Sequence, residues 1–277
     1  MKKFILTAAA FFLCCASLSA DELPLWEAGF GFTGLSLPDY RGSNQQRLFV
    51  LPFPYLVYRG EIFHMDRKGV YGFLFQSDRI QLNISADGGL PVKSNSNTAR
   101  RGMPNLDPTF QLGPALEICL TGPCTSTRLV QFRVPVRAVF ASDFTYLNGI
   151  GFVANPQVNL DFTNLGPSGK WNFGCSAGPL YATQQYHEYY YEVVPADSIP
   201  GVRNVYRARG GYSGSSLIVS TSRRFEHTWF GAFVRYDNLS GAVFADSPLM
   251  RTKQTLLAGF AVAWVFGQSE TLVQASP

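Results

Sequence analysis

Apolar and polar residues alternate with a period of two along several long segments of the chain. The alternation is clearest in residues 80–87, 110–118, 130–140 and 152–163, where most second positions carry Ile, Leu, Val, Phe or Ala. Successive side chains of a β-strand point to opposite faces, so this pattern predicts strands with one apolar and one polar face. The apolar positions of a helix would instead recur every three or four residues. The chain is therefore predicted to be all-β.

Eleven segments have the alternation or the composition of a strand, with turn-forming residues between them. These segments are 25–36, 47–58, 61–66 with 69–76, 79–87, 107–119, 127–140, 150–163, 169–181, 212–224, 227–238 and 253–266. A closed bacterial barrel contains an even number of strands, so we expect a twelfth to come from 183–195 or 239–250, or the true number to be ten. Two long connections, 88–106 and 182–211, are candidates for functional loops.

Composition favours a membrane barrel over a soluble fold. The chain contains 26 Gly, 23 Phe and 13 Tyr, yet only 15% of its residues are charged. After residue 20 the sequence has no run of roughly eighteen apolar residues, the length that a membrane-spanning helix needs. A barrel explains an apolar composition without a membrane-spanning helix, because half of the residues in its strands face lipid and half face a polar lumen. A soluble β-sandwich shares the alternation, so the alternation by itself leaves that alternative open.

Aromatic residues add a second argument for the membrane. They cluster near the ends of several predicted strands, as in Trp229-Phe230, and such clusters suit the interfacial girdles of a barrel. The last predicted strand carries aromatic residues at alternate positions and ends at Phe266, which resembles the signal that barrel-assembly machinery recognises. We therefore predict a transmembrane antiparallel β-barrel of 10 to 12 strands.

The first twenty residues have the layout of a secretory signal peptide. Lys2 and Lys3 form a short basic region, the run from Phe4 to Cys15 is apolar, and small residues lead to an expected cleavage site near Ala20. We accordingly divide the chain into a signal peptide, residues 1–20, and an outer-membrane β-barrel, residues 21–277. The expected location is the outer membrane of a Gram-negative bacterium.

Five charged residues fall on the polar faces of the predicted strands. A charge is costly in hydrocarbon, so these residues must face the lumen or one another. Two interpretations follow from their mixed signs. The residues form ion pairs that fill and rigidify the interior, or they line a narrow path for a polar solute. They are Asp87, Glu117, Arg133, Arg137 and Asp161.

Charge and cysteine patterns exclude several other functions. No basic run accompanies the formal net charge of +4, so nucleic-acid binding is not indicated. Cys119 and Cys124 flank a Thr-Gly-Pro turn, and export to an oxidising compartment would allow a disulfide between them. The cysteines form no CxxC motif, so we predict neither a metal site nor a cofactor.

Catalytic residues are not evident in the sequence. The three histidines, His64, His187 and His227, are far apart, and none precedes a serine by two residues as in the Ser-His pair of outer-membrane hydrolases. His187-Glu188 beside several tyrosines would suit acid–base chemistry, but a polar, aromatic loop segment at an interface explains this stretch better. We therefore do not expect an enzyme.

Several segments together resemble the MipA/OmpV family. They are the stretch Asp39-Tyr40-Arg41-Gly42-Ser43, the stretch from Tyr189-Tyr190-Tyr191 to Gly210-Gly211-Tyr212, and Asp246-Ser247-Pro248 followed by the last strand. Their order and spacing agree with the family over nearly the whole mature chain. The tail after Phe266 and the Cys119–Cys124 loop depart from its pattern.

This resemblance implies an outer-membrane scaffolding protein. The named member of the family, an MltA-interacting protein, joins a murein-degrading lytic transglycosylase to a penicillin-binding murein synthase, and other members are described as surface antigens and adhesion-related proteins. The family has no established catalytic residues. We therefore expect an interaction protein linked to murein synthesis and turnover, with a small diffusion channel or a surface adhesin as alternatives.

Overall fold

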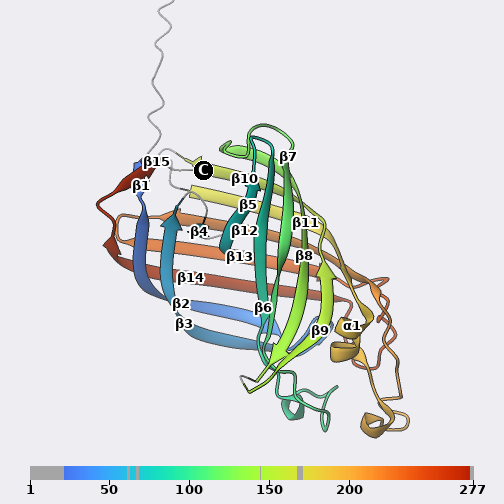
Figure 1. Cartoon of the computed structure of the whole chain (residues 1–277). Coiled ribbons are helices and arrows are strands. Elements are labelled where there is room, and N and C mark those ends of the chain that lie inside the picture. Colours follow the sequence, from blue (N-terminus) through green and yellow to red (C-terminus); the bar gives the residue numbers. More distant parts are fainter. Residues whose placement is uncertain (1–21, 61–62, 67–68, 144, 167–170, 275–277) are drawn as a thin grey trace, which may run out of the picture.

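The computed structural model describes residues 22–60, 63–66, 69–143, 145–166 and 171–274. The signal peptide expected at residues 1–20 lies outside these residues. Within them, no helix is long and apolar enough to span a membrane. Long antiparallel strands make up most of the molecule (Figure 1).

All the described strands except the first and the last follow one another around the wall of a barrel. The described strands are β1 (Glu22–Pro24), β2 (Trp26–Pro38), β3 (Gln46–Arg59), β4 (Phe63–Asp66), β5 (Gly69–Gln76), β6 (Ile80–Gly89), β7 (Thr109–Cys119), β8 (Arg128–Ser142), β9 (Leu147–Ala154), β10 (Gln157–Leu165), β11 (Trp171–Ala182), β12 (Gly211–Arg224), β13 (Thr228–Asn238), β14 (Gln254–Gln268) and β15 (Leu272–Gln274). From β2 to β9 and from β10 to β14 each strand pairs with the next in antiparallel fashion, β10 also pairs with β8, and β14 pairs back with β2.

In the part of the chain that the structure describes, the wall contains twelve strands, which confirms the predicted all-β antiparallel barrel. Strands β9 and β10 are two halves of one long strand, because both pair with β8 on one side and with β11 on the other. The source of the twelfth strand was predicted wrongly. It arises where the segment 61–76 divides into β4 and β5, whereas the stretch 183–195 contains a helix and 239–250 is a loop.

The outer face of the wall is an apolar surface. Alternate residues of β14 point outward, and the side chains of Phe260, Trp264 and Phe266 are each more than half exposed. Leu48 and Val50 of β3 are 76% and 68% exposed. Such side chains are stable on a barrel surface only where lipid covers them.

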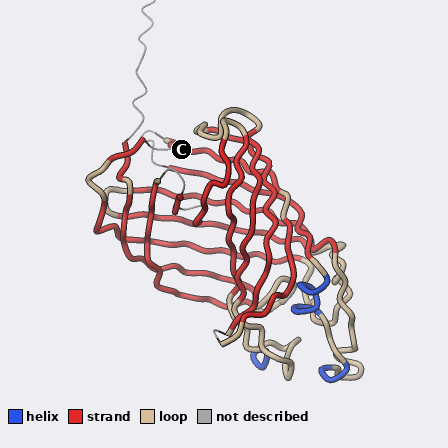
Figure 2. The backbone as a smooth tube through the Cα atoms, in the orientation of Figure 1, coloured by secondary structure: helices blue, strands red, loops and turns tan. Residues whose placement is uncertain are grey.

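The two ends of the barrel differ. At one end the connections are short, as at 77–79, 120–127 and 225–227, and the terminal strands β1 and β15 pair with each other. We call this end the terminal rim. At the other end lie the long loops 39–45, 90–108, 183–210 and 239–253, which include all the helical segments described (Figure 2).

These four long loops pack against one another, and we call the resulting unit the loop cap. All four contribute to one hydrophobic core of eleven buried residues. The core consists of Tyr40, Val92, Ala99, Met103, Leu106, Tyr191, Val193, Leu239, Ala242, Phe244 and Leu249. Because the loops bury apolar side chains of their own, they form a folded unit rather than loose connections.

Candidate functional site

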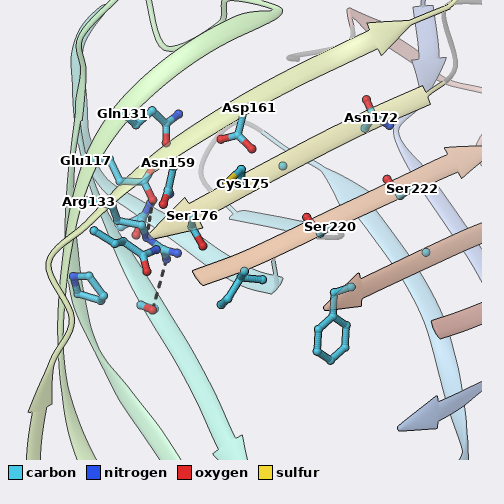
Figure 3. A pocket seen from close by; sticks show the side chains of 18 of the residues that line it. Glu117, Gln131, Arg133, Asn159, Asp161, Asn172, Cys175, Ser176, Ser220 and Ser222 are labelled. Carbon is cyan, nitrogen blue, oxygen red and sulfur yellow. Dashed lines mark hydrogen bonds and ion pairs between the residues drawn. The ribbon is translucent and has the colours of Figure 1, made fainter. Parts of the chain in front are cut away.

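The barrel encloses a cavity of about 970 Å³. Most of the side chains along one side of it are amides and hydroxyls, several of which are shown in Figure 3. These polar residues are Gln81, Asn83, Ser85, Gln131, Asn159, Asn172, Ser176, Ser220 and Ser222. The five charged residues singled out in the sequence, Asp87, Glu117, Arg133, Arg137 and Asp161, also line the cavity.

Ion pairs join most of these charges. Glu117 and Arg133 lie opposite each other in the ladder between β7 and β8, with 2.9 Å between Oε1 and Nε. Arg137 lies 3.4 Å from the Asp87 carboxylate and also donates to the Gln111 amide oxygen at 3.0 Å. These pairs link β6, β7 and β8 across the lumen face. Among the described residues, Asp161 has no ion-pair partner.

The opposite side of the lumen is apolar. Tyr55 and Val57 of β3 pack with Ala263 and Val265 of β14, and Phe53 and Trp229 pack against this cluster. Only polar or small residues were predicted on the inward faces of the strands, and this apolar side corrects that prediction. The missed signal is the run from Leu48 to Val57, which is apolar at both parities. The lumen therefore has a polar side, which we call the polar wall, and an apolar side formed by the cluster around Tyr55, which we call the apolar wall.

A glycine on β2 makes room for the apolar wall. Gly31 lies opposite Phe53 in the β2–β3 ladder. A Cβ atom at Gly31 would lie 2.8 Å from the Phe53 ring and would also collide with the Val262 carbonyl oxygen. Any larger residue at this position would push the Phe53 ring out of the wall.

A buried carboxylate lies near the terminal rim. Glu27 is 3% exposed and accepts hydrogen bonds from Arg59 Nη2 at 2.7 Å and from Arg224 Nε at 2.8 Å. The two arginines are 32 and 197 residues from Glu27 along the chain. The cluster was missed in the sequence because no local pattern connects β2, β3 and β12.

Helix α1 (Gln184–Tyr191) holds the loop cap together. Tyr191 stacks on Phe244 with 3.7 Å between ring centroids, and its hydroxyl donates to the Arg41 carbonyl oxygen at 2.8 Å. The Tyr189 hydroxyl accepts a hydrogen bond from the Asp107 amide at 2.8 Å. One helix thus reaches the other three loops of the cap.

His187 is a structural residue of this helix. It is fully buried, with Nδ1 2.5 Å from the Arg209 carbonyl oxygen and Nε2 in hydrogen-bond contact with Ser213. Burial lowers the pKa of His187, so the ring is neutral near pH 7. This stretch was predicted to be a polar loop segment at an interface, which is wrong, because it forms a helix in which Tyr186, His187 and Tyr191 are buried.

The remaining candidate groups lie apart from this helix. His227 is exposed in a turn at the terminal rim, and the side chain of His64 lies outside the described residues. No cluster of His, Cys, Asp and Glu suited to a metal ion occurs in the described part of the chain. Cys119 and Cys124 are joined by a disulfide at the end of β7, and the Cys124 amide donates to the Asp78 carbonyl oxygen at 2.7 Å. The disulfide closes the turn after β7, and this hydrogen bond fixes that turn to the neighbouring turn at 77–79.

The sequence matches a known protein family over most of its length. Residues 30–266 match the family described as MltA-interacting protein MipA. The chain belongs to the MipA family. This confirms the resemblance found in the sequence, and the match covers every strand of the barrel wall except the ends of β2 and β14. A MipA-family chain folded as a lipid-facing barrel is an outer-membrane protein.

Solved structures similar to this MipA-family chain are distant barrel proteins. The CymD monoaromatic hydrocarbon channel is 11% identical, with a TM-score of 0.35, over 89% of this chain and 90% of that one. The Ralstonia pickettii toluene transporter TbuX is 10% identical, with a TM-score of 0.26, over 91% and 71%. OprG from Pseudomonas aeruginosa is 10% identical, with a TM-score of 0.21, over 92% and 98%. No curated protein matches the chain.

Proposed function

We propose that this protein is an interaction protein that holds a lytic transglycosylase of the MltA type at the outer membrane, and through it a penicillin-binding murein synthase. The observation that carries the proposal is the family match over residues 30–266. A protein with this role needs a stable membrane anchor and an accessible surface on the periplasmic side. The barrel supplies the anchor.

The terminal rim has the features of the docking surface. Short turns and paired chain ends are typical of the periplasmic end of a bacterial barrel. The Cys119–Cys124 disulfide stiffens this end, and the exposed apolar side chains of Leu120, Phe225 and Leu272 project from it. Exposed apolar side chains on this rim are available to contact a protein partner. We therefore assign the transglycosylase contact to the rim.

Binding of a purified MltA-type transglycosylase to the barrel in nanodiscs tests this assignment. We expect saturable binding, and we expect Leu120→Asp and Phe225→Asp each to raise the Kd by about ten-fold or more, equivalent to ~1.4 kcal/mol. Val202→Asp is the matched control, because Val202 is 66% exposed but lies in the loop cap. Absence of binding, or equal weakening by all three variants, would contradict the proposal.

The cavity supports a second candidate function, a small diffusion channel. If polar solutes cross the lumen, planar-bilayer recordings should show current steps. Arg133→Ala should shift the selectivity of these steps towards cations, because it leaves the Glu117 carboxylate without its partner. Lys253→Ala removes the same charge from an exposed position outside the lumen and should leave the selectivity unchanged. A bilayer without current steps would exclude the channel.

A further inference from the structure

The hydrogen-bonded wall is interrupted between β3 and β6. Strand β3 pairs with β2 along its whole length but with β4 only through Tyr58 and Arg59. Strand β6 pairs with β5 only through the residues from Gln81 to Asn83. Within the described chain, no strand pairs with the facing edges from Gln46 to Pro54 on β3 and from Ile84 to Gly89 on β6. We call the interval between these two edges the lateral window; the short strands β4 and β5 are seen beside it in Figure 1.

The sequence of β3 is suited to an open edge. The Arg59 amide donates to the Leu25 carbonyl oxygen, so the odd-numbered residues of β3 direct their backbone groups towards β2. The even-numbered residues, including Pro52 and Pro54, face the window. Proline has no N–H group, so a further strand could not pair fully with this edge. Prolines at these positions protect the edge from edge-to-edge association.

The open edge of β6 is also protected from pairing with a further strand. The Cys119 amide donates to the Arg79 carbonyl oxygen, so odd-numbered residues of β6 face β7 and even-numbered residues face the window. The Gly88 amide, which points into the window, donates to the Asp87 carboxylate at 2.8 Å. This donor is thus satisfied locally, without a partner strand.

The window is closed at both ends. At the terminal-rim end, β4 and β5 bridge β3 and β6. At the other end, the loop that follows β6 is tied to the β2–β3 connection. Asn97 donates to the Asp39 carboxylate at 2.7 Å, and Arg47 donates to the Ser96 hydroxyl at 2.6 Å. A fixed frame of this kind holds the two edges apart without unrolling the barrel.

An apolar surface leads from the lipid side of the window into the lumen. Leu48 and Val50 point outward, while Phe49, Leu51 and Phe53 share the inward parity of the apolar wall. That wall ends at Trp229, whose ring centroid lies 5.7 Å from that of Tyr55. Both faces of β3 are therefore apolar beside the window, so an alkyl chain can contact this strand from the lipid and from the lumen.

The polar wall across from this surface offers hydrogen-bond acceptors. The buried Oδ1 atom of Asn159 has no donor among the described residues. Asn159 lines the cavity together with Asp161, which has no ion-pair partner in the described chain. An amide oxygen and a carboxylate two residues apart on the inner face of β10 favour a group that carries several N–H donors and a positive charge. Figure 3 shows Asn159 and Asp161 side by side on β10.

We propose that the lateral window admits a membrane lipid with a primary ammonium head group into the lumen. One alkyl chain lies along the inner face of β3 towards Trp229, and the ammonium group binds the acceptors on the opposite wall. This site is separate from the terminal rim, so it does not depend on the proposed interaction with a transglycosylase.

Quenching of Trp229 by brominated lipids tests the proposal. The barrel carrying Trp26→Phe, Trp171→Phe and Trp264→Phe retains one tryptophan and is reconstituted in liposomes. We expect brominated phosphatidylethanolamine to cause a loss of Trp229 fluorescence and brominated phosphatidylcholine, whose head has no N–H donor, to cause a much smaller loss. A barrel that retains only Trp264, which is 68% exposed on the lipid side, reports full quenching by both lipids.

Two variants locate the route of entry. Leu51→Glu places a carboxylate on the apolar path at the window and should abolish the quenching of Trp229. Gln81→Glu adds the same charge elsewhere in the lumen, at a position of β6 that is paired with β5 and lies outside the window, and should preserve it. Unquenched Trp229 beside fully quenched Trp264 would overturn the proposal, and equal quenching by the two lipids would overturn the choice of head group. The comparison of the two lipids uses no substitution in the window. It therefore tests the entry of lipid into the lumen even if the Leu51→Glu variant does not fold.

Discussion

Replacing Glu27 by Gln is expected to lower the free energy of unfolding of the barrel by about 3 kcal/mol. The substitution keeps the size of the side chain but leaves Arg59 and Arg224 without the carboxylate that both contact. Loss of one partner of a buried ion pair typically costs about 3–5 kcal/mol. The lower end applies, because the two arginine side chains are 20% and 27% exposed and water solvates them in part.

Unfolding by guanidinium in detergent, followed by the difference in gel migration between folded and unfolded barrel, measures this effect. Glu226→Gln is the control, since Glu226 is an exposed acidic residue at the same end of the barrel. We expect its midpoint to match that of the unmodified chain. Equal midpoints for both variants would show that the Glu27 cluster contributes nothing to stability.

Phe244→Ala is expected to loosen the loop cap and leave the barrel intact. Phe244 is fully buried, stacks on Tyr191 and lies 4.8 Å from the His187 ring. Removal of a buried phenylalanine ring usually costs about 3–5 kcal/mol, and here the cost falls on the cap rather than on the hydrogen-bonded wall. Proteases should therefore cleave the loops 183–210 and 239–253 much faster, while the migration of the unboiled barrel stays unchanged.

Asp246→Ala is the matched control for that experiment. Asp246 lies two residues from Phe244 in the same loop, but its side chain is exposed. We expect its cleavage pattern to match that of the unmodified chain. Slow cleavage of the Phe244→Ala cap would mean that the four loops do not depend on their shared core.

The alternation of apolar and polar residues was sufficient to predict those strands that have lipid on one face and polar side chains on the other. Strands β6, β7, β8 and β10 have lipid on one side and the polar wall on the other, so their period-two pattern is plain in the sequence. The ends of β3 could be predicted, but the apolar character of its inner face could not. An inward apolar residue is recognisable only once the opposite wall, with Trp229 and Val265, is known.

Other features depend on contacts between distant parts of the chain. The lumen position of Arg133 and Arg137 follows from parity, but their partners follow from the register of β6, β7 and β8. Helix α1 was missed because its run of aromatic residues resembles an interfacial segment, and only the loop core explains why those rings are buried. Residues 61–66 with 69–76 were counted as one strand, whereas they form two strands, β4 and β5, that pair with each other.

The pairing of β14 with β2 bears on the order of folding. Every other junction in the wall joins strands that are neighbours in the sequence, whereas the Thr33 hydroxyl meets the Phe260 carbonyl oxygen across 227 residues. The entropy lost in closing so long a chain makes this junction slow to form. Ring closure is therefore a late event, and the β1–β15 pair beside it holds the first and last strands together once they meet. A nascent chain that lacks β14 would keep the edges of β2 and β13 open, and such edges are templates for aggregation.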